Sequence, residues 1–196
     1  MTAADRNTTW RTTDIVVTAA IAVTFGVVFW AWNGVWAAAA PVFTAVPPAQ
    51  NVLYGVWLIP AVLAMLVVRK PGAALFAELV AAGVSALLGS QWGLDAVLSG
   101  ILQGLGAEAV FAAFRYRRFD LPVALLAGLG AAAGAFAHDI PLYYADQPVT
   151  TKAAIGICMA VSAVVIAGIG SWWLCRSLAA TGVLAPFASG RGQARV

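Results

Sequence analysis

The chain has 196 residues, of which 62% are hydrophobic and only 10% are charged. Soluble domains average about 45–50% apolar and about 25% charged residues, so this composition excludes an ordinary soluble enzyme and predicts an all-α integral membrane protein. The formal net charge is only +3, and the basic residues stand at the ends of apolar runs, where they indicate membrane topology rather than nucleic-acid binding.

Six apolar runs follow one another along the chain. A run of about 18 or more apolar residues can cross a bilayer as a helix, so we predict six transmembrane helices in a single domain that covers residues 1–180. The segment 181–196 is expected to be a flexible cytoplasmic tail. An alternative, less compatible with the length of the first run, makes that run a signal peptide cleaved near 37–40. The predicted helices cover about residues 15–32, 51–68, 73–89, 94–114, 121–144 and 153–174.

The distribution of basic residues predicts the topology, because cytoplasmic loops are enriched in Lys and Arg. With the N-terminus inside, ten of the eleven basic residues fall in inner segments and only Lys152 falls in an outer loop. Both termini are then cytoplasmic, and the loops at 33–50, 90–93 and 145–152 face outward. Prolines mark the first of these loops as a break between helices.

Small residues recur every four positions in the first predicted helix, at Thr18, Ala22 and Gly26. They lie on one face and let another helix approach closely. That helix can belong to this chain or to another subunit, and the spacing does not distinguish the two. Tryptophans near helix ends are expected in the interfacial belts rather than in a binding site. These tryptophans are Trp30, Trp32, Trp36, Trp172 and Trp173.

Polar and aromatic residues gather toward the predicted outer ends of several helices. Residues four and seven positions apart share a helical face. Polar and aromatic faces of this kind occur in the second, fourth and fifth predicted helices, and together they predict an outward cavity. The 90–93 turn adds Gln91 and Trp92, and Glu78 lies deeper, in the middle third of the membrane. The three faces are Gln50, Tyr54 and Trp57; Asp95, Ser99 and Gln103; and Asp139 and Tyr143 with His138 beside them.

Aromatic rings combined with a few carboxylates suit a cationic, aromatic small molecule. A ring attracts a cation through its quadrupole, and amides give directional hydrogen bonds to ring nitrogens. Glu78 is the strongest single candidate, because a carboxylate at a helix centre costs about 2.5–3.5 kcal/mol on insertion scales and therefore usually faces a cavity or a partner.

Two further ionisable residues have more than one interpretation. His138 either binds the ligand or forms a structural pair with Asp139. Glu108 is about 140° round the helix from Gln103, so it does not extend the polar face of its helix. We expect Glu108 to pair with Arg115 or Arg117, or to face a partner, rather than to bind the ligand.

No enzyme signature is present in the sequence, and no cofactor is expected. A Walker A loop, HExxH and GxSxG are all absent, so ATP-driven transport would require other subunits. Cys158 and Cys175 are about 25 Å apart along one predicted helix, too far for a disulfide, and no Cys/His cluster predicts a metal site. The alternative function is a stand-alone proton-coupled transporter that uses Glu78 or the His138–Asp139 pair.

Five short segments together resemble the YkoE family, the substrate-binding (S) components of energy-coupling factor transporters. They are QNVLYGVW at 50–57, AEL at 77–79, GSQWG at 89–93, QGLGAE at 103–108 and RYR at 115–117. The resemblance spans about residues 12–180. It implies a six-helix component of the plasma membrane that captures thiamine or its hydroxymethylpyrimidine precursor and carries its site inward by toppling in the lipid bilayer.

The same resemblance implies partners. The S component is expected to associate with a transmembrane coupling subunit and two cytoplasmic ATPase subunits. The first helix of S components often meets the coupling subunit through an Ala-x-x-x-Ala-like face. The nearest match here is Thr18-x-x-x-Ala22-x-x-x-Gly26, which departs from that pattern.

Overall fold

A computed structural model describes residues 9–191, and within this range the chain forms helices and turns without a strand. The last long segment contains a π-helical stretch, η3, between two α-helices, whereas η1 and η2 are 3-10 helices. The elements are α1 (Thr12–Ala39), η1 (Ala40–Phe43), η2 (Pro47–Leu58), α2 (Ile59–Val68), α3 (Ala73–Leu87), α4 (Asp95–Ala113), α5 (Leu121–Tyr143), α6 (Val149–Ser162), η3 (Ala163–Gly170), α7 (Ser171–Ala180) and α8 (Ala188–Arg191).

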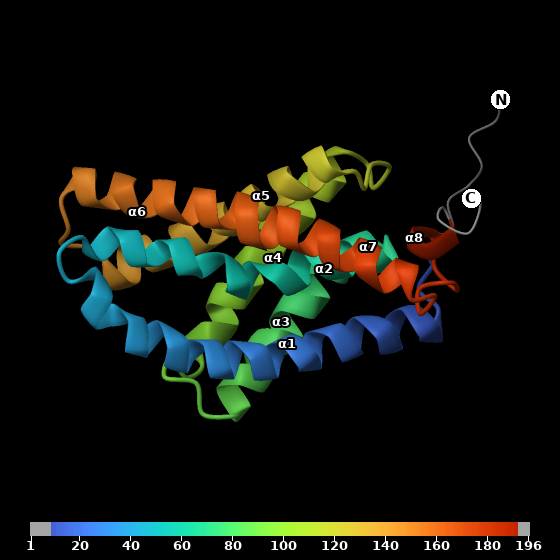
Figure 1. Cartoon of the computed structure of the whole chain (residues 1–196), viewed down its shortest axis with the longest axis horizontal. Helices are drawn as coiled ribbons and strands as arrows, with labels where there is room; N and C mark the ends of the chain where they lie inside the picture. Colours follow the sequence, from blue (N-terminus) through green and yellow to red (C-terminus); the bar gives the residue numbers. More distant parts are fainter. Residues whose placement is uncertain (1–8, 192–196) are drawn as a thin grey trace.

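The long helical segments form one bundle (Figure 1). The segments α1, η2–α2 and α6–α7 run along its long axis, whereas α3 crosses them obliquely and the turn between α3 and α4 projects from the side of the bundle. The helix α2 lies at the centre, and all of its residues from Pro60 to Val68 are buried. Next to it, α4 and α5 pack backbone against backbone, because a methyl group on Gly106 would collide with the carbonyl of Gly130.

Five segments are long and apolar enough to cross a membrane, and α3 is shorter than these. The 15 residues of α3 extend over about 22 Å at 1.5 Å per residue, less than the roughly 30 Å of bilayer hydrocarbon. The sequence predicted six crossings, and α3 is the segment that does not reach the expected length. The five long segments are Thr12–Phe43, Pro47–Val68, Asp95–Ala113, Leu121–Tyr143 and Val149–Ala180.

The predicted outer loop at 33–50 is mostly helical. The helix α1 continues to Ala39, η1 follows directly, and η2 begins at Pro47. The alanines at 37–40 are strong helix formers, and Pro41 and Pro47 stand in the first turns of η1 and η2, where a missing N–H costs nothing. The prolines therefore start new helices rather than making a long loop, and α1 reaches far enough to bring Asn33 and Trp36 beside η2.

The small-residue face of α1 packs inside this chain. Thr18 and Ala22 are completely buried, and a Cβ added at Gly26 would lie 2.5 Å from the Val84 Cβ atom of α3. As a docking surface for a coupling subunit, this face stays a prediction. Thr18, Ala22 and Gly26 could meet a partner only if α1 separated from α3.

The segment after α7 is partly structural rather than a flexible tail. Leu184 and Phe187 are buried in the core, and the Ser189 hydroxyl donates a hydrogen bond of 2.9 Å to the carbonyl of Val67. The expectation of a flexible tail is therefore wrong for residues 181–191. Residues 192–196 lie outside the described part of the chain.

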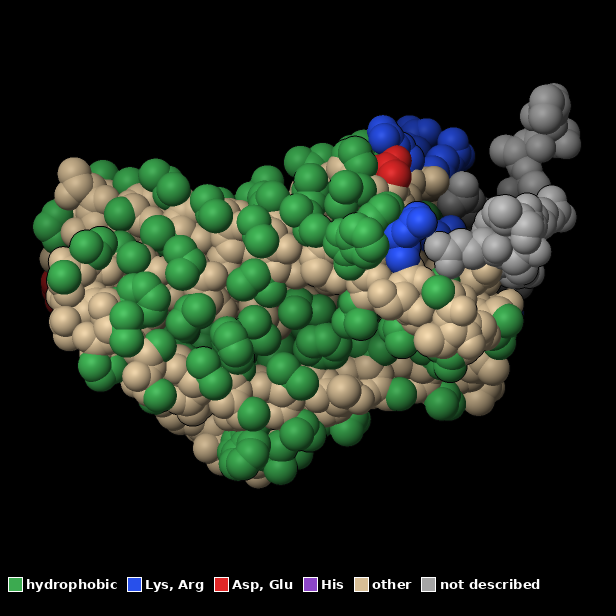
Figure 2. Space-filling model, in the orientation of Figure 1, with side chains coloured by type: hydrophobic (Ala, Val, Ile, Leu, Met, Phe, Trp, Pro, Cys, Tyr) green, Lys and Arg blue, Asp and Glu red, His purple; other side chains and the backbone are tan. Residues whose placement is uncertain are grey.

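One end of the bundle is basic. The Trp10 indole donates a hydrogen bond to the Pro71 carbonyl, and the Arg11 guanidinium lies 5.8 Å from the ring centroid of Phe187. The start of α1, the turn before α3 and the segment before α8 therefore meet at this end. Figure 2 shows Lys and Arg side chains toward the same end, over the turn between α4 and α5 and near α7, whereas hydrophobic side chains are spread along the long face of the bundle.

Candidate functional site

A cavity of about 320 Å³ lies between α1, η2, α3, α4 and α5, and side chains of all five helices line it. Nine of the ten residues that the sequence predicted as ligand contacts are among its lining residues: Gln50, Tyr54, Trp57, Glu78, Trp92, Gln103, His138, Asp139 and Tyr143. The tenth, Gln91, is exposed and does not line the cavity. Because Gln91 lies in a turn, no helical periodicity indicated which way its side chain would point.

Several lining residues were not predicted as ligand contacts. Asp95 and Ser99 share the polar face of Gln103, so their signal was present in the sequence. Asn33 falls where a loop was predicted, and its position depends on the full length of α1. Trp36 was expected in the interfacial belt but lines the cavity.

Three rings form an aromatic cluster on one wall. The Trp36 and Trp57 ring centroids are 5.1 Å apart, and Tyr54 lies 5.3 Å from Trp57 and 6.3 Å from Trp36. Tyr54 and Trp57 come from η2, where residues three apart share a face. Ser162 of α6 fixes η2 through its hydroxyl, which accepts from the Gly55 N–H at 2.7 Å. The wall therefore offers flat, electron-rich surfaces to an aromatic ligand.

Glu78 of α3 points at the junction between η2 and α2. Its Oε2 atom accepts a hydrogen bond of 3.0 Å from the Ala61 backbone N–H, one of the first-turn N–H groups of α2 that have no partner within the helix. The Glu78 side chain is completely buried. One carboxylate oxygen is thus used to hold two helices together, and the other is left for a different partner.

Two buried acceptors in the described part of the chain have no hydrogen-bond partner: Oε1 of Glu78 and Oδ1 of Asn33. Both residues line the cavity. The amide nitrogen of Asn33 donates to the Ser90 hydroxyl at 2.9 Å, which orients the side chain. A buried polar atom without a partner is costly and uncommon, so these two oxygens are suited to accept hydrogen bonds from a ligand.

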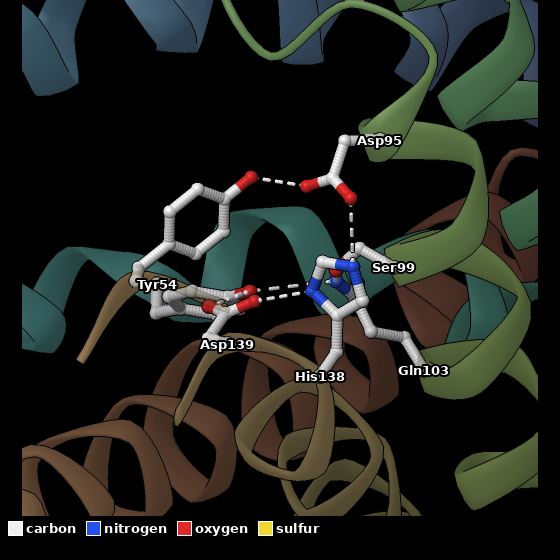
Figure 3. Close-up of polar contacts among 7 residues, drawn as sticks. Tyr54, Asp95, Ser99, Gln103, His138 and Asp139 are labelled. Carbon is white, nitrogen blue, oxygen red and sulfur yellow. Dashed lines mark hydrogen bonds and ion pairs between the residues drawn. The ribbon is translucent and has the colours of Figure 1, made fainter. Parts of the chain in front are cut away.

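A histidine bridges two carboxyl groups in the wall of the cavity. His138 Nδ1 lies 2.7 Å from Asp139 Oδ1, and its Nε2 lies 3.1 Å from Asp95 Oδ1. Figure 3 shows His138 between these two side chains. The other oxygens accept from tyrosines, because Tyr54 donates to Asp139 at 2.8 Å and Tyr143 donates to Asp95. His138 is therefore both the structural partner of Asp139 and a lining residue of the cavity.

Gln103 extends the polar side of the cavity toward the aromatic cluster. Its amide nitrogen donates to the Ser99 hydroxyl at 2.7 Å and lies 3.5 Å from the Tyr54 hydroxyl. Within residues 9–191, no Lys or Arg side chain lines the cavity, whereas three carboxyl groups do. The cavity therefore favours a ligand that donates hydrogen bonds or carries positive charge.

Glu108 has a structural role that the sequence did not indicate. Its carboxylate accepts backbone N–H groups of Gly72 at 2.7 Å and of Ala74 at 3.0 Å, at the start of α3. Among residues 9–191, no ion pair joins it to Arg115 or Arg117, so the expected pairing is wrong. A carboxylate at a helix N-terminus accepts hydrogen bonds from free N–H groups and interacts favourably with the positive end of the helix dipole.

Comparisons with known proteins agree with this architecture. A family model described as "ABC-type cobalt transport system, permease component" matches residues 13–134. The chain is 38% identical over 184 residues to YkoE of Bacillus subtilis (strain 168), which bears the name HMP/thiamine permease protein; the match covers 93% of this chain and 91% of YkoE. A crystal structure described as an S-component of an ECF transporter superposes with a TM-score of 0.89 at 37% identity, covering 94% of this chain and 93% of the other. The chain is therefore a multi-pass plasma-membrane protein and belongs to the YkoE family of ECF-transporter S-components.

Proposed function

We propose that the cavity captures thiamine or hydroxymethylpyrimidine, and that the chain delivers the ligand to a transmembrane coupling subunit driven by two ATPase subunits. The observation that carries this proposal is the pair of unpartnered acceptors, Glu78 Oε1 and Asn33 Oδ1, in a cavity that also has an aromatic wall. An aminopyrimidine is flat and aromatic and carries an amino group, so it can stack on the rings and donate to these oxygens.

The charged side of the cavity suits the second ring of thiamine. A thiazolium ring is a cation, and the carboxyl groups of Asp95 and Asp139 line the cavity. Hydroxymethylpyrimidine has no such cation and would rely on the acceptors and on Gln103. The volume of about 320 Å³ is within the range of about 300–1,000 Å³ typical of small-molecule sites.

An organic ligand is favoured over a cobalt ion. In the part of the chain that the structure describes, no group of three or more His, Cys, Asp or Glu side chains is placed to hold a metal. Both ring nitrogens of His138 already face carboxylates, which leaves no nitrogen for a metal. YkoE of Bacillus subtilis is named as a permease for thiamine and hydroxymethylpyrimidine (HMP), which agrees with the donor and acceptor pattern of this cavity.

For the topology we propose six crossings, with the basic end of the bundle in the cytoplasm. The positive-inside rule supports this orientation, and α3 would then cross as a short, oblique helix. Single cysteines placed at Thr44 and at Thr181, after replacement of Cys158 and Cys175, should differ in labelling by an impermeant maleimide on intact cells. Labelling at Thr181 but not at Thr44 would reverse the orientation.

The binding proposal is tested by titrating the purified, detergent-solubilised protein with thiamine and then with hydroxymethylpyrimidine while recording tryptophan fluorescence. Saturable quenching is expected, because three tryptophans line the cavity. Trp57→Phe should reduce the quenching, whereas the exposed Trp173→Phe, on α7, should leave it unchanged. Absence of quenching by both compounds in folded protein would overturn the vitamin assignment.

A further inference from the structure

His138 makes a contact that requires an additional proton. Each of its two nitrogen–oxygen contacts, 2.7 Å to Asp139 and 3.1 Å to Asp95, needs one hydrogen between the two atoms. A neutral imidazole carries only one N–H, whereas an imidazolium carries two. The bridge Asp95–His138–Asp139 therefore holds one proton more than a neutral histidine with two carboxylates.

The hydrogen bonds around the bridge keep this proton between its three side chains. Tyr54 donates to Oδ2 of Asp139, and Tyr143 donates to Oδ2 of Asp95, so the outer oxygen of each carboxyl group already accepts a hydrogen bond. The additional proton therefore lies in one of the two inner contacts, either on the imidazole or on the carboxyl oxygen that the imidazole faces. In both arrangements the bridge has a net charge of −1 with this proton and −2 without it.

The groups that surround the bridge include no other cation. Besides His138, six titratable side chains line the cavity: Tyr54 from η2, Glu78 from α3, Asp95 from α4, Asp139 and Tyr143 from α5, and Tyr144 directly after α5. Among the described residues, no Lys or Arg joins them in the lining. His138 is therefore the only lining side chain there that can carry positive charge, and a cationic ligand would compete with it for the same two carboxylates.

We infer that His138 determines whether the cavity prefers a cationic or a neutral ligand, and that capture of a cation releases the additional proton of the Asp95–His138–Asp139 bridge. This inference rests on the proposed function, because it assumes that the cavity binds thiamine or its neutral precursor. A cation near Asp95 and Asp139 replaces the charge of the bridging proton and disfavours its retention. A neutral pyrimidine leaves the bridge protonated.

The inference gives opposite expectations for the two ligands. Where binding releases one proton, the affinity changes about tenfold for each pH unit, so thiamine affinity should fall as the pH is lowered. Affinity for hydroxymethylpyrimidine should not fall with that slope. The preference for the cation should therefore decrease in acid and increase in base.

Isothermal titration calorimetry at one pH, in two buffers of different ionisation enthalpy, counts the protons exchanged on binding. Thiamine binding to the wild-type protein should release close to one proton more than binding to His138→Gln. A ligand that exchanges its own protons does so in both proteins, so the difference isolates His138. Asp146→Asn, which removes an exposed carboxylate beyond the cavity, is the matched control and should behave as wild type.

Three outcomes are decisive. Thiamine binding with no proton release, or with the same release in His138→Gln, overturns the inference and leaves the proposed function intact. Failure of folded wild-type protein to bind either ligand overturns the proposed function itself. If His138→Gln does not fold, Asp95→Asn takes its place, because it removes one bridging carboxylate and should also reduce the number of protons released. If neither variant folds, equal proton release by thiamine and hydroxymethylpyrimidine in the wild-type protein overturns the inference.

Discussion

Replacing Glu78 by Gln separates ligand binding from stability. The variant keeps an oxygen that can accept the Ala61 N–H at 3.0 Å, but it places an amide N–H₂ where the unpartnered Oε1 now faces the cavity. A donor then meets the donating amino group of the ligand. A hydrogen bond to a charged group contributes about 1.5–3 kcal/mol, so Kd for thiamine should rise about 10–150-fold.

The same substitution should leave the ligand-free protein at least as stable. It removes a completely buried carboxylate, which opposes folding, and it replaces one unpartnered polar atom by another, so the second term nearly cancels. Thermal unfolding in detergent without ligand should therefore show an unchanged or higher Tm. Fluorescence titration of the same preparation gives Kd.

Glu108→Ala is the matched comparison, because it removes a carboxylate that lies within an apolar helix but does not line the cavity. Its loss frees the Gly72 and Ala74 N–H groups at the start of α3 and should cost about 1–2 kcal/mol of stability, with Kd nearly unchanged. Unchanged affinity in folded Glu78→Gln would remove Glu78 from the site and refute the reasoning.

Three further changes test the scaffold. Gly106→Val should lower Tm and weaken thiamine binding, because the added Cβ would collide with Gly130 and push α4 away from α5. Gly83→Val should do neither, because a Cβ at Gly83 meets nothing within 4 Å. Equal effects of the two substitutions would contradict the packing argument. Ser162→Ala removes the acceptor of the Gly55 N–H and should lower the free energy of unfolding by about 1–3 kcal/mol. It should also raise Kd, because Tyr54 and Trp57 would be displaced. Unfolding and binding curves measure both effects, and Ser177→Ala, at an exposed position, is the control. Asp120→Ala should cost about 0.5–1 kcal/mol, because Asp120 caps α5 through the Val123 N–H at 3.2 Å. Burial opposes ionisation, but Arg118 and this N–H hold the pKa of Asp120 below its usual value, so its contribution is present at neutral pH and is lost as the pH falls below about 4; a Tm difference from wild type that persists at pH 2 would contradict this.

Much of the cavity followed from helical spacing. Asp95, Ser99 and Gln103 all line the cavity from α4, as their four-residue spacing predicts, and His138 of α5 contacts Asp95. Gln50, Tyr54 and Trp57 also line the cavity, although η2 is a 3-10 helix and not the α-helix that the spacing assumed. These positions were predictable because polar side chains inside a membrane protein must face a cavity or one another.

Other features depend on distant segments that spacing does not place. Angular position on α4 showed that Glu108 leaves the polar face, but not that the start of α3 lies beside it. Asn33 reaches the cavity only because α1 extends to Ala39. The burial of Thr18 against α3 was one of two possibilities that small residues allow equally.

The unequal lengths of the helices have a consequence for the surrounding lipid. The helix α1 has 28 residues and extends over about 42 Å, nearly twice the roughly 22 Å of α3. Exposed leucines flank the α3–α4 turn, with Leu87 89% and Leu94 83% exposed. With α3 crossing the bilayer as proposed, lipid beside this turn must thin, whereas lipid beside α1 must thicken or the helix must tilt. The rim of the molecule is therefore mismatched to a bilayer of any single thickness, and acyl-chain length becomes a variable that sets the resting tilt of the protein.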